Sequence, residues 1–396
     1  MKTLPRLLLL LILALTTAAH AAAPVVSNVR AAQRTGTKLV DIYYDLADPD
    51  SATVTVAIAL SADGGVNYSL PAATFTGDYG AGVTPGTNKR AVWNAGIDWN
   101  GLFTSRGRAR VTAEDGTSPV GMAFIPGSFF MMGGTGNTSE QPVHSVLVSD
   151  FWMDRFEVTK DLWDRVLTWG AARGYAIVGS GEGVAANHPV QTVSWHDVVK
   201  WCNARSAMEG RTPAYYTDAA QTLIYKVGDS NLTDVMVKWT GNGYRLPTEA
   251  EWEKAARGGL NSRDYPWGNG ITGSQANYNL SGDPYSTNGV QTTPVGYYNG
   301  GQVPAGVDMA NAYGLYDMAG NVWEWCWDWY DGSYYSTTGA TTANTRGPAT
   351  GSYRVIRGGS WVNSADSLRV ADRSFSTPTN RYFYNFFGFR CALGQP

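Results

Sequence analysis

The chain has few side chains that could act as nucleophiles or as soft metal ligands. Its cysteines are Cys202, Cys326 and Cys391, and its four histidines lie on separate segments. No two histidines have the spacing of metal ligands, so a multi-histidine metal site is disfavoured. In an oxidising compartment, three cysteines permit one disulfide and leave one thiol over.

Carboxylates and amides are more frequent, but they form no obvious acid–base pair. Asp154, Glu157, Asp366 and Asp372 are scattered, and the chain has neither a Gly-x-Ser-x-Gly turn nor a phosphate-binding glycine loop. Oxygen donors are instead frequent in the turn-rich segment after Gly258. Such donors can bind Ca²⁺, and the same side chains can also stabilise turns by local hydrogen bonds.

Short helices with clear N-caps are predicted between irregular segments. Thr159 and Ser194 are expected to begin two helices, and Thr248 with Glu251 forms a capping box before a third. One face of the second helix should be apolar, with Trp195, Val198, Val199 and Cys202. The tryptophans at 323, 325, 327 and 329 predict a strand with one set in the core and the other partly exposed.

Composition limits the class of protein. The net charge of −3 gives no general attraction to nucleic acid. The 46 glycines and 15 tryptophans indicate a loop-rich fold held by aromatic packing. Residues 1–21 have basic, apolar and small-x-small regions in the order of a signal peptide. We therefore expect a secreted, periplasmic or cell-surface protein with no membrane span after signal removal.

Two domains are predicted after the signal peptide. Residues 24–116 contain short alternating strands at 39–46 and 52–60, with further strands near 90–93 and 108–112. This pattern is typical of a small all-β, immunoglobulin- or fibronectin-like sandwich. Residues 121–396 form the second domain, for which composition predicts only an irregular α+β fold.

Several motifs in the second domain occur together and in order. They are Met122–Gly133, Phe151–Thr159, His188–Trp195, Tyr244–Arg257, Asn311–Trp325, Arg357–Trp361 and Phe387–Ala392. Together they resemble the formylglycine-generating enzyme family, the sulfatase-modifying factors. The resemblance covers roughly residues 121–394 and implies an α+β fold of the C-type-lectin-like kind.

One feature of that family is missing. The family's oxidase has two reactive cysteines shortly after the Arg-Gly-Gly-Ser motif, and this chain has no cysteine between Cys326 and Cys391. Simple counting places Asn363 and Leu368 at those positions. The loop before Arg369 is about three residues short, which leaves the second position open, but no alignment restores a thiol. An amide and an isobutyl group cannot replace two thiolates as ligands of Cu(I). Copper and copper-dependent cysteine oxidation are therefore not expected.

The resemblance also implies two structural Ca²⁺ ions. The first would be bound by Asn277, the Tyr278 carbonyl, Asn288 and the Val290 carbonyl. The second would be bound by Asp317, the carbonyls of Gly320 and Val322, and Glu324. Asn288 stands where a carboxylate is usual, so the first site should be the weaker.

The resemblance further implies a disulfide between Cys202 and Cys391, which leaves Cys326 as a small buried residue. The remnant pocket should lie near Trp323, Ser360, Asn363 and Arg373. The leading hypothesis is an exported family member that binds a peptide, an exported protein or a small ligand there. The alternatives are an oxidoreductase of altered chemistry acting on an exported protein or peptide, and a structural or adhesive surface protein.

Overall fold

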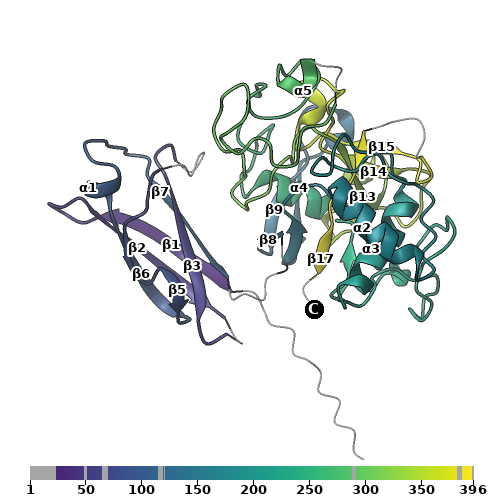
Figure 1. The fold of residues 1–396 in the computed structure, drawn as a ribbon, viewed down its shortest axis with the longest axis horizontal. Helices are drawn as coiled ribbons and strands as arrows, with labels where there is room; N and C mark the ends of the chain where they lie inside the picture. The colour runs from purple at the N-terminus through teal and green to yellow at the C-terminus, as the bar shows by residue number, and fades with distance from the viewer. Residues whose placement is uncertain are drawn as a thin grey trace, which may run out of the picture.

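The computed structural model describes residues 24–48, 51–64, 70–114, 119, 121–287, 291–380 and 386–394. A β module is followed by a larger mixed domain (Figure 1). In these ranges no helix has both the length and the apolar character needed to cross a bilayer. The expected signal peptide, residues 1–21, lies outside the described ranges.

The N-terminal module is a sandwich of two antiparallel sheets. One sheet has the order β1-β2-β6-β4 and the other β5-β3-β7. The strands are β1 (Val25–Gln33), β2 (Leu39–Ala47), β3 (Val54–Ser61), β4 (Phe75–Gly77), β5 (Gly80–Val83), β6 (Gly86–Asn94) and β7 (Arg108–Glu114), and α1 (Ala95–Asp98) follows β6. The sandwich predicted from the sequence is confirmed. Strand β1 was not predicted because it is exposed along almost its whole length and shows no alternation.

The second domain has two four-stranded sheets and one hairpin. The first sheet has the order β12-β17-β11-β8 and the second β15-β14-β13-β16. These strands are β8 (Met122–Ile125), β11 (Phe151–Asp154), β12 (Tyr244–Arg245), β13 (Trp323–Trp329), β14 (Arg354–Arg357), β15 (Ser374–Ser376), β16 (Phe387–Gly388) and β17 (Ala392–Gly394), and the hairpin is β9 (Ser128–Met132) with β10 (His144–Val148). The last strand in sequence, β17, lies between β12 and β11.

The helices begin at the N-caps expected from the sequence. They are α2 (Lys160–Ala171), α3 (Trp195–Met208), α4 (Glu249–Arg257) and α5 (Pro284–Thr287). Thr159 accepts from Leu162 N at 3.2 Å. The Thr248 hydroxyl accepts from Glu251 N at 3.1 Å while Glu251 accepts from Thr248 N at 2.8 Å, which completes the predicted capping box.

Burial in the second domain is more extensive than the alternation predicted. Helix α3 is buried on every face from Trp195 to Ser206, not on one face only. All seven residues of β13 are buried, and none of its four tryptophans is more than 5% exposed. The reason is that apolar clusters cover both faces of β13, one around α2 and α3 and the other around α4. Fully buried Arg354 also covers the Trp329 ring, at 3.5 Å from its centre.

Candidate functional site

Trp323, Ser360 and Asn363 meet at one point of the second domain. Asn363 Oδ1 accepts hydrogen bonds from Trp323 Nε1 at 2.9 Å and from Ser360 Oγ at 2.6 Å. Ser360 is fully buried, Trp323 is nearly so, and Asn363 is partly exposed. The structure therefore brings together three of the four residues expected at the pocket.

Two glycines after β14 shape the loop that carries Ser360 and Asn363. Gly358 and Gly359 have φ values of 94° and 73°, which favour glycine. A Cβ on Gly359 would lie only 2.6 Å from the Leu368 side chain. The Arg-Gly-Gly-Ser motif thus allows the chain to pass close to the segment that follows Asn363.

Arg357, the first residue of that motif, anchors the other end of the loop. It is fully buried, and its Nη2 bonds to Glu253 at 2.6 Å and to the Val370 carbonyl at 2.7 Å. Its Nη1 bonds to the carbonyls of Ala371 and Asp372. A planar guanidinium with five donors can hold several carbonyl groups at once. In the sequence Arg357 is only one residue of a motif, and no local pattern predicts this positioning role.

Asn363 and Leu368, which simple counting places where the family has its cysteines, have different surroundings. Leu368 is completely buried in a small apolar cluster with Tyr265, Ala276 and Ala319. An amide oxygen fixed by two donors and a buried isobutyl group provide no pair of soft ligands. The residues present therefore do not fit a copper ion.

Arg373 does not join the group around Asn363. Its Nε and Nη2 bond to the two oxygens of Glu249 at 2.7 and 2.9 Å, and its Nη1 bonds to the Ser139 carbonyl at 2.8 Å. The guanidinium also lies 4.0 Å from the centre of the Tyr335 ring. Because Arg373 is only 6% exposed, these contacts place it in a buried ion pair that supports the fold.

The residues expected at the second calcium site lie on the loop before β13 and on β13 itself. Asp317 has φ of 56°, and its Oδ2 accepts from Gly296 N at 2.6 Å. Burial raises the pKa of the Asp317 carboxyl to about 6. Gly320 and Val322 follow on the same loop, and Glu324 is the second residue of β13. The four residues thus follow one another within one short segment of the chain.

Glu324 is already engaged within the protein. Its two oxygens accept from Arg390 Nε and Nη2 at 2.7 to 2.9 Å, and one of them also accepts from Trp252 Nε1 at 2.8 Å. All three side chains are buried. A buried carboxylate is stabilised by such a guanidinium partner. Glu324 thus has a structural role whether or not an ion is bound.

A third carboxylate, Glu157, lies beside this loop, whereas in the sequence it was only one of several scattered carboxylates. It accepts from Asn321 Nδ2 at 2.7 Å and from Val322 N at 3.1 Å. Burial raises the pKa of Glu157 well above its usual range, and the charges of Asp317 and Glu324 raise it further. The cluster therefore accommodates a proton or a positive partner more readily than a full set of negative charges.

Asn277, from the first expected calcium site, contacts the same loop. Its carbonyl accepts from Asn321 N at 3.0 Å, and a Cβ on Gly320 would lie 2.2 Å from that oxygen. Asn277 Nδ2 donates to the Gln291 carbonyl at 2.9 Å. Its buried Oδ1 has no hydrogen-bond partner among the described residues. A buried amide oxygen without a donor is suited to a cation.

The rest of the first set is only partly described. Tyr278 follows Asn277, whereas Asn288 and Val290 lie outside the described ranges. Within those ranges, no three side chains of His, Cys, Asp or Glu are arranged as a metal site. An ion at either position would therefore depend on amide and carbonyl oxygens as well as carboxylates.

The cysteines lie in two places. Cys202 on α3 and Cys391 before β17 are both buried, with their sulfur atoms 3.8 Å apart and no bond between them. The disulfide between them stays a prediction. Cys326 is completely buried on β13, and burial raises the pKa of its thiol well above the usual range. Cys326 is therefore a buried apolar residue, as expected.

The fold and the motif geometry agree with a comparison to known families. Residues 108–394 match the family model described as "Sulfatase-modifying factor enzyme 1-like domain". The chain belongs to the sulfatase-modifying factor family. The second domain accordingly has the formylglycine-generating-enzyme fold, an α+β fold of the C-type-lectin-like kind.

Curated relatives and a solved structure cover the same region. The formylglycine-generating enzyme of Thermomonospora curvata is 34% identical over 290 residues, which is 69% of this chain and 93% of the enzyme. The serine/threonine-protein kinase pkn1 of Chlamydia caviae is 34% identical over 281 residues, 69% of this chain but only 38% of the kinase. The structure of Treponema denticola variable protein 1 has a TM-score of 0.53 and 32% identity, and the match covers 69% of this chain and 95% of that one.

Proposed function

We propose that this sulfatase-modifying factor family member is exported, binds a peptide or another small ligand beside Asn363, and does not oxidise cysteine with copper. The observation that supports the proposal is the hydrogen bonding of the Asn363 side-chain amide. Its Oδ1 is used by two donors of the protein, whereas no hydrogen bond of its Nδ2 is described. Nδ2 is a neutral donor, and a peptide carbonyl is a suitable acceptor for it.

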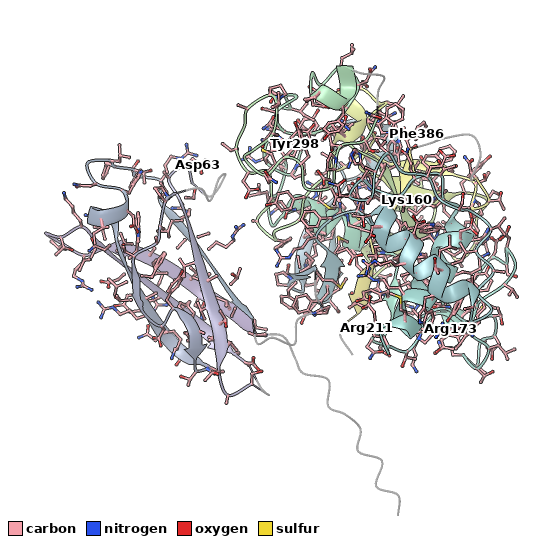
Figure 2. All side chains as sticks on the ribbon, in the orientation of Figure 1. Asp63, Lys160, Arg173, Arg211, Tyr298 and Phe386 are labelled. Carbon is pink, nitrogen blue, oxygen red and sulfur yellow. The ribbon has the colours of Figure 1, made fainter. Side chains whose placement is uncertain are left out.

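The surroundings of Asn363 support an extended ligand. Trp361 packs edge-on against Phe386, with ring centres 6.4 Å apart, and Phe386 is labelled in Figure 2. Val362, between Trp361 and Asn363 in sequence, is 39% exposed. Peptides in an extended conformation are held by main-chain hydrogen bonds and by apolar contacts of alternate side chains. The amide and the neighbouring apolar groups supply both kinds of contact.

The absence of cysteine oxidation is tested with a Cys-x-Pro-x-Arg peptide. Purified protein with Cu(I) should leave the peptide mass unchanged, because neither Asn363 nor Leu368 can bind copper as a thiolate does. The Thermomonospora enzyme serves as the positive control. Turnover above a no-protein control would contradict the proposal and favour an oxidoreductase of altered chemistry.

Ligand binding is tested by selecting a random peptide display library on the immobilised protein. Enriched peptides should bind the unaltered protein and Asp366→Asn, a control in the neighbouring exposed turn. They should bind Asn363→Leu at least about tenfold more weakly, because one hydrogen bond in a partly buried site is lost. Failure to enrich any peptide, or equal binding to Asn363→Leu, would contradict this part of the proposal.

We further propose that Ca²⁺ binds at the two expected sites, one at Asn277 and one at Asp317, which both adjoin the loop before β13. Two observations support it. The buried Asn277 Oδ1 has no donor in the part of the chain that the structure describes, and the carboxylates of Glu157, Asp317 and Glu324 are gathered around Arg390. Calcium prefers such hard oxygen ligands from turns and would supply positive charge to the cluster. Its role would be structural, since the loop leads directly into β13.

A contact function at the protein surface is the second candidate. Phe375 is 45% exposed and Tyr353 is 42% exposed, and their ring centres are 4.9 Å apart. Tyr330 lies 4.4 Å from Phe375 and extends the cluster. Exposed aromatic clusters are enriched at protein interfaces. Replacing Phe375 by Ser should abolish binding to a partner surface while leaving peptide binding at Asn363 unchanged, which separates the two candidates.

A further inference from the structure

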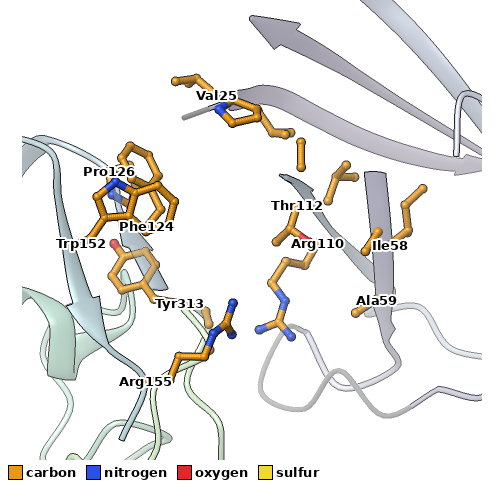
Figure 3. Close-up of a pocket in the computed structure, with 17 residues that line it drawn as sticks. Val25, Ile58, Ala59, Arg110, Thr112, Phe124, Pro126, Trp152, Arg155 and Tyr313 are labelled. Atoms are coloured by element: carbon orange, nitrogen blue, oxygen red, sulfur yellow. The ribbon is translucent and has the colours of Figure 1, made fainter. Parts of the chain in front are cut away.

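A cavity of about 270 Å³ lies within the second domain. It is separate from the larger cavity that both domains line, where Trp152 and Tyr313 face the β module (Figure 3). None of its lining residues belongs to the group of Trp323, Ser360 and Asn363. Its walls come from the end of α4, the β9–β10 hairpin and two loops that carry arginines. A ligand held here would therefore use other contacts than one at Asn363.

Three guanidinium groups from separate segments line this cavity. Arg257 is the last residue of α4, Arg263 lies on the loop that follows this helix, and Arg369 lies on the loop after β14. Among the residues that line the cavity, Asp264 alone carries a carboxylate. Planar guanidinium groups bind oxyanions through parallel, charge-assisted hydrogen bonds. The lining therefore favours an anion over a neutral molecule or a cation.

Buried carboxylates hold two of the three guanidinium groups in place. Arg369 Nη1 and Nη2 bond to the two oxygens of Glu140 at 2.9 and 2.8 Å. Arg257 Nε and Nη2 bond to Glu253 Oε1 at 2.9 and 2.7 Å, and Nη2 also bonds to the Gly133 carbonyl at 2.7 Å. Both carboxylates are fully buried. Donors that are fixed in this way lose little freedom when a ligand binds.

Arg257 keeps one end of its guanidinium without a partner. The residue is only 4% exposed, yet its Nη1 has no hydrogen bond to any of the described residues. Native structures rarely leave a buried donor unpaired, so such a group in a cavity wall calls for an acceptor. An oxygen of a bound anion would supply this acceptor.

Arg263 supplies the charge that the protein itself does not neutralise. Glu140 and Glu253 offset Arg369 and Arg257 from behind the wall. Arg263 is exposed, and within the part of the chain that the structure describes its guanidinium has neither a hydrogen bond nor an ion pair. Its structural contribution to the fold is therefore small, and its charge is available to a ligand.

The glycine loop, Gly133–Gly136, adds main-chain donors to the same wall. A Cβ on Gly136 would collide with Arg369 Nη1, so only glycine lets the loop pass so close to that guanidinium. The N–H groups of Thr135 and Gly136 have no hydrogen-bond acceptor among the described residues, and both residues line the cavity. Main-chain N–H groups in such loops are common ligands of phosphate groups.

The β9–β10 hairpin gives the cavity an apolar side. Met131 on β9 and Val143 just before β10 line it, and they are 40% and 42% exposed. Ligand sites commonly combine apolar side chains with a few polar groups that fix the orientation of the ligand. An apolar group attached to the anion would cover these two side chains.

We propose that this cavity binds a small phosphate monoester whose organic group is apolar. The phosphate oxygens accept hydrogen bonds from Arg263, from Arg257 Nη1 and from the glycine loop. The organic group lies on Met131 and Val143. A phosphate monoester has three terminal oxygens, so it can accept from three segments at once, whereas a carboxylate has only two. This site is independent of the one proposed at Asn363.

The probe is phenyl phosphate, titrated at pH 7.5 into the protein without its signal peptide by isothermal calorimetry. The neutral dimethyl ester of phenyl phosphate should bind at least about tenfold more weakly, because the charge-assisted hydrogen bonds are lost. Inorganic phosphate should also bind more weakly, because it cannot cover Met131 and Val143. The proposal is overturned if phenyl phosphate does not bind, or if the neutral ester binds equally well.

Two variants at the cavity, each with a matched control, test its location. Arg263→Gln should weaken phenyl phosphate binding at least about tenfold while the melting temperature stays unchanged, because a charged donor is lost that has no described role in the fold. Arg165→Gln removes the same charge from an exposed position of α2 outside the cavity and should leave binding unchanged. Equal binding by Arg263→Gln and the unaltered protein would refute the site.

The second pair of variants places a negative charge on β9. Met131→Glu brings a carboxylate to the rim of the cavity and should weaken binding, because it repels the phosphate. Phe129→Glu makes the same change two residues earlier on the same face of the strand, where the side chain is 68% exposed and does not line the cavity. It should leave binding unchanged. Equal effects of the two variants would show that phenyl phosphate binds elsewhere.

Discussion

Asn363 acts as a hydrogen-bond acceptor for its own domain and offers a donor to its surroundings. Its Oδ1 satisfies Ser360, which is fully buried, and Trp323, which is nearly so. A thiol at the same position would be a much weaker acceptor for these two donors. Asparagine therefore differs from cysteine at this position both in its chemistry and in its local hydrogen bonding.

At this scale we predict that Asn363→Leu lowers the free energy of unfolding by about 1–3 kcal/mol, because a buried hydroxyl and an indole N–H lose their acceptor. Asn363→Asp keeps an acceptor at the same place and should cost less. Urea denaturation of the three proteins measures the difference. If the Leu and Asp variants lose the same free energy of unfolding, the two hydrogen bonds do not stabilise the fold as their distances indicate.

Two elements position the site around Asn363: helix α4 and the loop after β14. Arg357 binds Glu253 of α4 and three carbonyls of residues 370–372, while Arg373 binds Glu249 of the same helix. Removing one partner of such a buried pair leaves a charge without compensation. The helix and the loop are therefore expected to lose their order together.

Asp372, in the same loop, makes this element sensitive to pH. Burial raises the pKa of its carboxyl to about 6, against the effect of the neighbouring Arg357 and Arg369. The folded protein thus binds this proton more tightly than the unfolded chain. The stability it contributes is complete below about pH 4 and is lost as the pH rises to about 6.

We therefore predict that Asp372→Asn is more stable than the unaltered protein at neutral pH, by an amount on the order of 2–3 kcal/mol. Below about pH 4 the two proteins should be alike, because Asp372 is then protonated in both the folded and the unfolded state. Melting temperatures measured from pH 4 to 7 test this, with the exposed Asp366→Asn as control. If the melting temperatures of all three proteins change with pH in the same way, Asp372 is not the group that makes stability depend on pH.

At this scale, local sequence patterns predicted the helix starts. Contacts between residues far apart in the chain could not be predicted in this way. The N-caps at Thr159 and Ser194 depend on side-chain bonds to nearby N–H groups, so they could be identified. The grouping of Asn363 with Trp323 followed from the family resemblance. The role of Arg373 could not be predicted, because its partner Glu249 lies 124 residues away in the chain. The complete burial of β13 depends on layers formed by distant helices, which no alternation within the strand indicates.

For the molecule as a whole, Cys202 near the middle of the chain lies beside Cys391 near its end. The sulfur atoms are 3.8 Å apart across 189 residues of sequence. After export we predict a disulfide here, with Cys326 left as a free thiol. Closing so long a loop would stabilise the fold by at most about 4–5 kcal/mol, because the disulfide lowers the conformational entropy of the unfolded chain.

Peptide mapping under non-reducing conditions tests this disulfide directly. Cys202→Ala with Cys391→Ala should lower the midpoint of denaturation, and a reducing agent should lower that of the unaltered protein to a similar value. Cys326→Ala serves as the matched control and should leave the cross-linked peptide in place. A bond that includes Cys326 would show that the pairing is wrong.

Calcium is expected to act on the stability of the whole second domain. A chelator should lower the melting temperature and Ca²⁺ should restore it, since an ion that binds only the folded state adds about 2.7 kcal/mol at a hundredfold excess over its dissociation constant. Asp317→Asn should reduce this shift, whereas Asp366→Asn should not. Replacing Glu324 would not isolate the effect of calcium, because it also removes the ion pair with Arg390.

An unchanged melting temperature after chelation of calcium-loaded protein would mean that Asp317 and Asn277 only stabilise turns. The Asn277 Oδ1 atom would then have to be satisfied by water.

The position of β17 has a consequence for the order of events during synthesis. This strand, near the end of the described chain, lies between β11 and β12, and Cys391 N donates to Asp154 Oδ2 across 237 residues. The β12-β17-β11-β8 sheet cannot be completed until β17 has been made. Such distant contacts slow folding, because a long loop must be ordered before the contacts form. The edges of β11 and β12 that pair with β17 therefore stay unpaired until that strand has been made.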